Sequence, residues 1–85
     1  MTRGEIKVMQ EHLTYWKGLT DRNFVVIFGP VADPNGIYAL AIVEANDEAV
    51  VYGFGINDPA IKADLGFRFE VFPMLQPILR EVNYL

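Results

Sequence analysis

The sequence contains no cysteine, which excludes disulfides, thiolate chemistry and a cysteine-ligated zinc site. It also contains no run of lysine and arginine, and 7 basic against 11 acidic residues give a formal charge of −4. Nucleic acids and anionic membranes are bound through basic patches, so neither is expected as a partner. The longest apolar runs, Phe24–Phe28 and Ile37–Val43, fall far short of the ~20 residues that a membrane-spanning helix needs. The N-terminus shows no apolar signal-peptide core, and we expect a soluble, cytoplasmic protein.

The chain is short for its content of apolar residues. Its 85 residues predict a single domain spanning positions 1–85, and 52% of them are hydrophobic and 13% aromatic. A domain of this size buries only about 60% of the surface that its unfolded chain exposes. Because neither a disulfide nor an evident metal site stabilises it, oligomerisation remains as the common means of stabilisation. We therefore expect a homodimer or an oligomer built from dimers.

A first helix is predicted over Gly4–Leu19, where apolar residues recur every three or four positions and form one stripe. Phe24–Phe28 is a wholly apolar, β-branched and aromatic run typical of a strand. Gly29–Gly36 is dense in turn-forming residues and predicts a loop, and Ile37–Glu44 predicts a second strand. The two strands form a hairpin with a wide connection.

A second helix is predicted over Glu48–Ile56, with Asn46 and Asp47 as candidate caps. Asp58 is the predicted N-cap of a further short helix that begins at Pro59, where the missing N–H costs nothing. The alternation in Phe67–Phe72 predicts a strand with one buried face. Ile78–Leu85 fits either a short helix or an edge strand.

The predicted element order is α-β-β-α-β. This order favours an α+β fold in which an antiparallel sheet carries its helices on one face. One further strand before the first helix would complete the β-α-β-β-α-β order of the ferredoxin-like fold.

His12 is the only histidine and lies at the border of the apolar stripe of the first helix. An imidazole there suits general acid–base chemistry near neutral pH, although a surface or core histidine without a function is the more common case. No second histidine or cysteine supports a metal site. Asp33 is either the carboxylate of an Asx turn or a group that orients the imidazole, and Asp58 is most simply a helix cap.

The chain resembles the YciI-like (YCII-related) domain family from about Glu5 to Met74. The ordered residues that carry the resemblance are Glu11-His12-Leu13, Tyr15 and Leu19, then Gly29-Pro30, Asp33 and Gly36, then Ala39–Glu44, and finally Asp58-Pro59, Ala63, Leu65 and Phe69–Val71.

The resemblance implies a ferredoxin-like fold of the dimeric α/β-barrel type, which pairs through its sheets and forms a small cleft. It implies that His12 is the acid or base, that Asp33 is its more favoured partner and that Asp58 is the other acid of the cleft. The set expected to bind substrate is Asp58, Gly29, Pro30 and Tyr15. One similar branch contains a dehydrochlorinase acting on a chlorinated, hydroxylated aromatic compound, which implies chemistry without a metal or other cofactor.

One feature departs from the family pattern. Members begin with a β-strand, whereas this chain opens on Thr2-Arg3-Gly4-Glu5 and continues directly into the first helix. That strand is central in the ferredoxin-like sheet, so we expect a gap beside the hairpin. The gap would be filled by an inward shift of Phe67–Phe72, by Ile78–Leu85 or by a partner chain.

Two functions follow as hypotheses. The first is a small homodimeric enzyme in which His12 and Asp33 carry out lyase-like proton transfer on a small polar or aromatic molecule. The second is a non-catalytic module for ligand binding or assembly. The geometry around His12 distinguishes them, because only the enzyme needs an imidazole paired with a carboxylate and open to a ligand.

Overall fold

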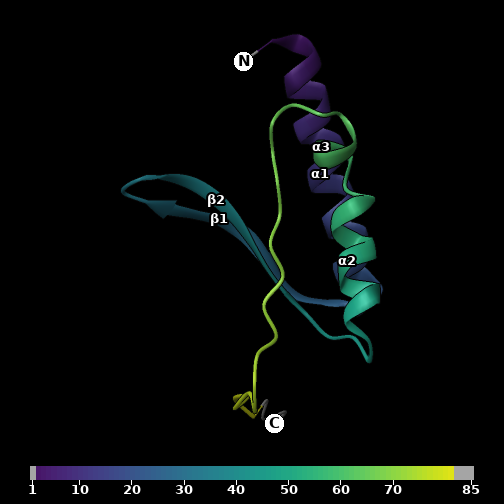
Figure 1. The fold of residues 1–85 in the computed structure, drawn as a ribbon, viewed down its shortest axis with the longest axis vertical. Coiled ribbons are helices and arrows are strands. Elements are labelled where there is room, and N and C mark those ends of the chain that lie inside the picture. The colour runs from purple at the N-terminus through teal and green to yellow at the C-terminus, as the bar shows by residue number, and fades with distance from the viewer. Residues whose placement is uncertain (1, 82–85) are drawn as a thin grey trace, which may run out of the picture.

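A computed structural model describes residues 2–81 of the chain. The elements follow in the order α1 (Arg3–Asp21), β1 (Val25–Asp33), β2 (Gly36–Val43), α2 (Glu48–Ile56) and α3 (Pro59–Lys62). The two strands form one antiparallel sheet (Figure 1). The predicted α+β fold class is confirmed, and the arrangement of helix, hairpin and helices is consistent with the ferredoxin-like type.

Helix α1 begins and ends at identifiable signals. A capping box holds its start, since the Thr2 hydroxyl accepts the Glu5 N–H and the Glu5 side chain accepts the Thr2 N–H. The chain leaves the helix through Asn23, whose φ of 68° lies in the left-handed region that asparagine tolerates. Trp16 and Leu19 are its buried residues. The predicted helix is confirmed, with one further residue at its N-terminal end and two at its C-terminal end.

The predicted wide loop over Gly29–Gly36 is wrong. Strand β1 continues to Asp33, which pairs with Gly36, so only Pro34 and Asn35 turn the chain. The Asp33 carboxylate accepts the Asn35 N–H at 2.8 Å, which closes this tight Asx turn. Gly36 has a φ of 138°, a conformation that other residues rarely adopt.

The hairpin projects from the helices as an arm, and its tip lies far from them (Figure 1). At its base, Val25 joins Trp16 and Leu19 in a small buried core. Partly buried residues pack around these three: Tyr15, Phe24, Phe28, Ala41, Val43 and Phe54. The outer half of the arm is exposed, as the 79% exposure of Ile37 shows.

Helices α2 and α3 are capped as the sequence predicts. The Asp47 carboxylate accepts the Ala49 N–H at the start of α2, and the Asp58 carboxylate accepts the Ala60 N–H at the start of α3. Pro59 occupies the first turn of α3. Both helices follow the same side of α1, and α3 packs directly against it (Figure 1).

The predicted strand over Phe67–Phe72 is wrong, because residues 67–81 contain no regular secondary structure. A strand needs a hydrogen-bonding neighbour, and within the described residues the sheet consists of β1 and β2 alone. The expected gap is therefore filled neither by Phe67–Phe72 nor by residues 78–81. Of the segment Ile78–Leu85, for which a helix or an edge strand was expected, residues 82–85 lie outside the described part.

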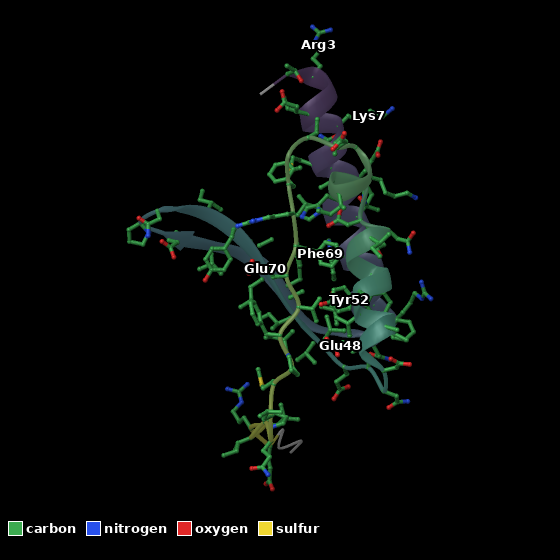
Figure 2. All side chains as sticks on the ribbon, viewed as in Figure 1. Arg3, Lys7, Glu48, Tyr52, Phe69 and Glu70 are labelled. Carbon is green, nitrogen blue, oxygen red and sulfur yellow. The ribbon has the colours of Figure 1, made fainter. Side chains whose placement is uncertain are left out.

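Phe69 fixes this irregular segment to α2. Its ring lies against the backbone of Gly55 and meets the ring of Tyr52 edge-on at a centroid distance of 6.0 Å. In Figure 2, Phe69 points toward α2 and Glu70 points the opposite way. The period-2 pattern of the sequence therefore still selects which side chain is turned toward the helices, although no ladder forms.

The Phe69 contact predicts opposite effects for two alanine substitutions in α2. A Cβ at Gly55 would lie 2.6 Å from two ring atoms of Phe69, whereas one at Gly53 meets nothing within 4 Å. We expect Gly55→Ala to lower the free energy of unfolding by about 1–3 kcal/mol through overpacking. Gly53→Ala, the matched control, should raise it by up to about 1 kcal/mol through helix propensity. Urea unfolding measures both, and equal effects would contradict the contact.

Candidate active site

His12 of α1 and Asp58 at the start of α3 lie together, although 46 positions separate them in the sequence. The Nδ1 atom of His12 is 2.8 Å from both carboxylate oxygens of Asp58. Since a carboxylate only accepts hydrogen bonds, this contact places the ring proton on Nδ1. The basic lone pair of the neutral imidazole is then on Nε2.

The Asp58 carboxylate accepts two further hydrogen bonds. The indole N–H of Trp16 donates to Oδ2 at 2.7 Å, and the backbone N–H of Ala60 donates to Oδ1 at 2.8 Å. Asp58 is only 5% exposed, so these three donors replace the water that a buried carboxylate would otherwise need. Trp16 follows His12 by four residues, which places both side chains on the same face of α1.

One aromatic ring, that of Phe28, packs against the His12 imidazole. The ring of Phe28 meets it edge-on at 5.5 Å, and Phe28 itself stacks on Trp16 at 5.2 Å with planes only 4° apart. The His12 side chain is 15% exposed. Its Nε2 has no hydrogen-bond partner among the described residues. It is also not one of the fully buried polar atoms. Nε2 is therefore the nitrogen that this part of the chain leaves without a hydrogen-bond partner.

The structure pairs His12 with a different aspartate from the one that was favoured. Asp33 lies exposed at the tip of the hairpin, where its carboxylate closes the turn, and it makes no contact with His12. Asp58, expected as the second acid, is the partner. The difference from the expected pairing has a simple cause. The buried carboxylate of Asp58 caps α3 and accepts the Nδ1–H of His12 at the same time. The catalytic role of His12 itself stays a prediction.

The other residues expected to bind substrate lie in different places. Gly29 and Pro30 are in the middle of β1 rather than in a loop. Tyr15 lies beside Trp16, with its ring edge-on at 5.5 Å, and its hydroxyl donates to the carbonyl of Phe54 at 2.6 Å. Burial raises the pKa of the Tyr15 hydroxyl, and the charge of Asp58 raises it further, while Arg22 acts in the opposite direction. Their substrate-binding roles remain predictions.

Trp16 was not among the predicted site residues, because its place in the apolar stripe indicated only a core residue. The sequence feature that could have indicated a role in the site is its spacing of four positions from His12, which places both side chains on one face of the helix. A groove of about 350 Å³ lies between α1 and β1; Phe28 lines it, whereas His12, Trp16 and Asp58 do not. It is lined by Leu13, Lys17, Thr20, Val26, Ile27 and Phe28.

Among residues 2–81, no cluster of three or more histidine and carboxylate side chains is placed to hold a metal ion. No helix in the same range has the length and apolar character needed to cross a membrane.

The YCII-related domain model matches residues 3–75, which includes α1, the hairpin, α2, α3 and the segment that carries Phe69. The chain belongs to the YCII-related domain family. No curated protein and no solved structure matches it. Both members of the His12–Asp58 pair lie within the matched region.

The hydrogen bonds of Asp58 predict that it stabilises the fold more than an ordinary cap does. Asp58→Ala leaves the His12, Trp16 and Ala60 N–H groups without their acceptor, and we expect a loss of about 3–5 kcal/mol. The matched control is Asp47→Ala, which removes an exposed cap of α2 and should cost about 1 kcal/mol. Urea unfolding compares the two, and similar losses would show that Asp58 acts as a cap alone.

The raised pKa of Tyr15 predicts a loss of stability in alkali. Because the pKa in the folded state lies above the unfolded value, the contribution of Tyr15 is complete below about pH 10 and is lost as the pH rises through the folded pKa. Tyr15→Phe removes this dependence, so the stability of the variant should fall less steeply above that pH. Denaturation at a series of pH values measures it, with Tyr52→Phe as the control; parallel curves for parent and Tyr15→Phe would contradict it.

Proposed function

We propose that this YCII-related protein is a small homodimeric enzyme that uses His12 and Asp58 for lyase-like acid–base chemistry without a metal. The observation that carries the proposal is the geometry of one imidazole. Both oxygens of a buried carboxylate lie 2.8 Å from Nδ1, while Nε2 is free of protein partners in the described chain. General bases in enzymes are oriented in this way.

In the proposed reaction Nε2 removes a proton from a carbon atom of the substrate. The electron pair of that C–H bond forms a double bond to the neighbouring carbon, and the leaving group departs with its own bonding pair. The imidazolium that results is stabilised by the negative charge of Asp58, which also prevents the ring from rotating. Trp16 and Ala60 act as positioning residues, since their N–H groups hold the carboxylate in place.

The surroundings favour a small polar or aromatic substrate. The groove between α1 and β1 has a volume of about 350 Å³, at the low end of small-molecule sites, and its link to the imidazole is Phe28, which lines the groove and meets the His12 ring edge-on. Leu13 and Phe28 give it apolar walls, and the ammonium of Lys17 lies at its side, 2.9 Å from the Asp21 carboxylate.

The alternative is a module that binds a small ligand or assembles without catalysis. The observation that favours it is that Asp58 already has a complete structural role. It caps α3 and joins that helix to α1 through Trp16 and His12. This structural role alone would be a reason for a non-catalytic protein to keep the His12–Asp58 pair.

The dimer belongs to the proposal because so much apolar surface is open to solvent. Ile37, Tyr38 and Leu40 are each about half exposed or more, and a two-stranded hairpin is at best marginally stable by itself. The cytoplasm is the proposed compartment.

A nitrobenzisoxazole, whose ring opens when a base removes its C–H proton, tests the proposed base directly. The parent should open the ring about 10²–10⁴ times faster than His12→Gln. Asp58→Asn should also be slow, because the imidazole is no longer held with Nε2 as its basic atom. Asp33→Asn is the control and should match the parent, since Asp33 lies at the hairpin tip.

Nitrogen chemical shifts of the single histidine give a second readout that does not need turnover. They should show a proton on Nδ1 in the neutral ring of the parent and a mixture of tautomers in Asp58→Ala. Equal rates for the parent and His12→Gln would leave the binding module as the better account. A slow Asp33→Asn would restore Asp33 as the functional carboxylate.

A further inference from the structure

Helix α1 carries two neighbouring stripes of side chains, because residues three or four positions apart share a face of a helix. His12 and Trp16 lie on the first stripe, which belongs to the candidate site. Leu13, Lys17 and Thr20 lie on the second stripe and line the groove between α1 and β1. The second stripe follows the first by one residue, a rotation of about 100° around the helix. The groove therefore runs beside the candidate site without including it.

The ring of Phe28 in β1 contacts both the groove and the candidate site. It lines the groove, and it meets the imidazole of His12 edge-on at a centroid distance of 5.5 Å. Among the described residues that line the groove, Phe28 is the only aromatic one. The Phe28 ring is thus the boundary between the groove and the imidazole.

The position of the Phe28 ring is held by its neighbours. The ring stacks on the indole of Trp16 with planes 4° apart, and a rotated ring would lose this contact. Trp16 is itself buried and donates its indole N–H to Asp58 at 2.7 Å. The carboxylate that orients the imidazole of His12 therefore also fixes, through Trp16, the ring that covers part of it.

The imidazole of His12 has little open surface left. Its Nδ1 faces the Asp58 carboxylate, and the side chain is mostly buried. Its Nε2 has no hydrogen-bond partner in the described chain and is not one of the fully buried polar atoms. A single neighbouring ring can therefore decide how much space a molecule has beside this nitrogen.

We propose that Phe28 is a specificity-determining residue, whose ring limits the size of the molecule that reaches Nε2 of His12. This inference rests on the proposed function and adds the residue that selects its substrate by size. Part of the substrate lies in the groove, and the Phe28 ring restricts the bulk of the part beside the imidazole. An apolar wall discriminates strongly, because one methylene more or less changes selectivity by about 10–200-fold.

Two acylating reagents of different size test this restriction without turnover. Diethyl pyrocarbonate and the bulkier di-tert-butyl dicarbonate both acylate an imidazole nitrogen, and the ring protons of the single histidine report the reaction by NMR. The measured quantity is the rate with the bulky reagent divided by the rate with the small one, with free N-acetylhistidine as the reference. In this ratio the intrinsic nucleophilicity of the nitrogen cancels. We expect the ratio to rise severalfold in Phe28→Leu and roughly tenfold or more in Phe28→Ala.

Two control variants separate access to the imidazole from a general loss of structure. Ile27→Ala shortens the neighbouring, exposed side chain of the groove lining and should keep the ratio of the parent. Leu19→Ala weakens the buried core on the same face of α1 and so imitates the loss of stability expected in Phe28→Ala. It should also keep the ratio of the parent, provided that circular dichroism shows a folded chain.

An unchanged ratio in a folded Phe28→Leu would overturn the proposal. A ratio that rises as far in Leu19→Ala as in Phe28→Ala would overturn it too, because the cause would then be general loosening. In the ring-opening assay, the Phe28 variants should gain rate with a bulkily substituted nitrobenzisoxazole relative to the unsubstituted one. Equal ring-opening rates for the parent and His12→Gln would overturn the proposed function, whereas the acylation ratio would still decide whether Phe28 controls access.

Discussion

The buried carboxylate of Asp58 is the group on which the helical part of this protein depends. It accepts N–H groups from a histidine, a tryptophan and the backbone of the helix that it begins. A charge in the interior is tolerated only when such donors replace water, so removing any of them raises the cost of burying it. The positions of α1 and α3 are thereby linked, and the small aromatic group of Trp16 and Phe28 forms around the link.

The same contact gives the imidazole its chemical character. A histidine with both nitrogens in water has no fixed proton and no fixed orientation, whereas His12 has one nitrogen bonded to the carboxylate and one without a partner in the described chain. Structure and proposed chemistry therefore use the same atoms. This overlap is why a fold-stabilising role and a catalytic role must be separated by experiments that read proton transfer and unfolding independently.

Local signals predicted the helices well. The apolar spacing of α1 and the caps Asp47 and Asp58 are properties of short stretches, and each appears in the structure where the sequence placed it. The hairpin connection was predicted wrongly because Gly29 and Pro30 have turn-forming character that an edge strand also accepts. The strand at Phe67–Phe72 was predicted from a real alternation, but pairing depends on a neighbour that no local pattern reveals.

The candidate site was predictable only in part for the same reason. His12 stood out as the single histidine, and both aspartates were candidates. Choosing between them required knowing that α3 folds back against α1, which is a contact between residues 46 positions apart. Trp16 looked like a core residue, and it is one, but its indole N–H also serves the carboxylate. A residue that has two roles shows only the simpler one in a sequence.

Pro30 has a consequence for the exposed arm. It stands in the middle of β1 and has no N–H to donate. Another strand could therefore not form an uninterrupted ladder along that edge, and proteins use proline in this way to keep exposed strands from pairing with other chains.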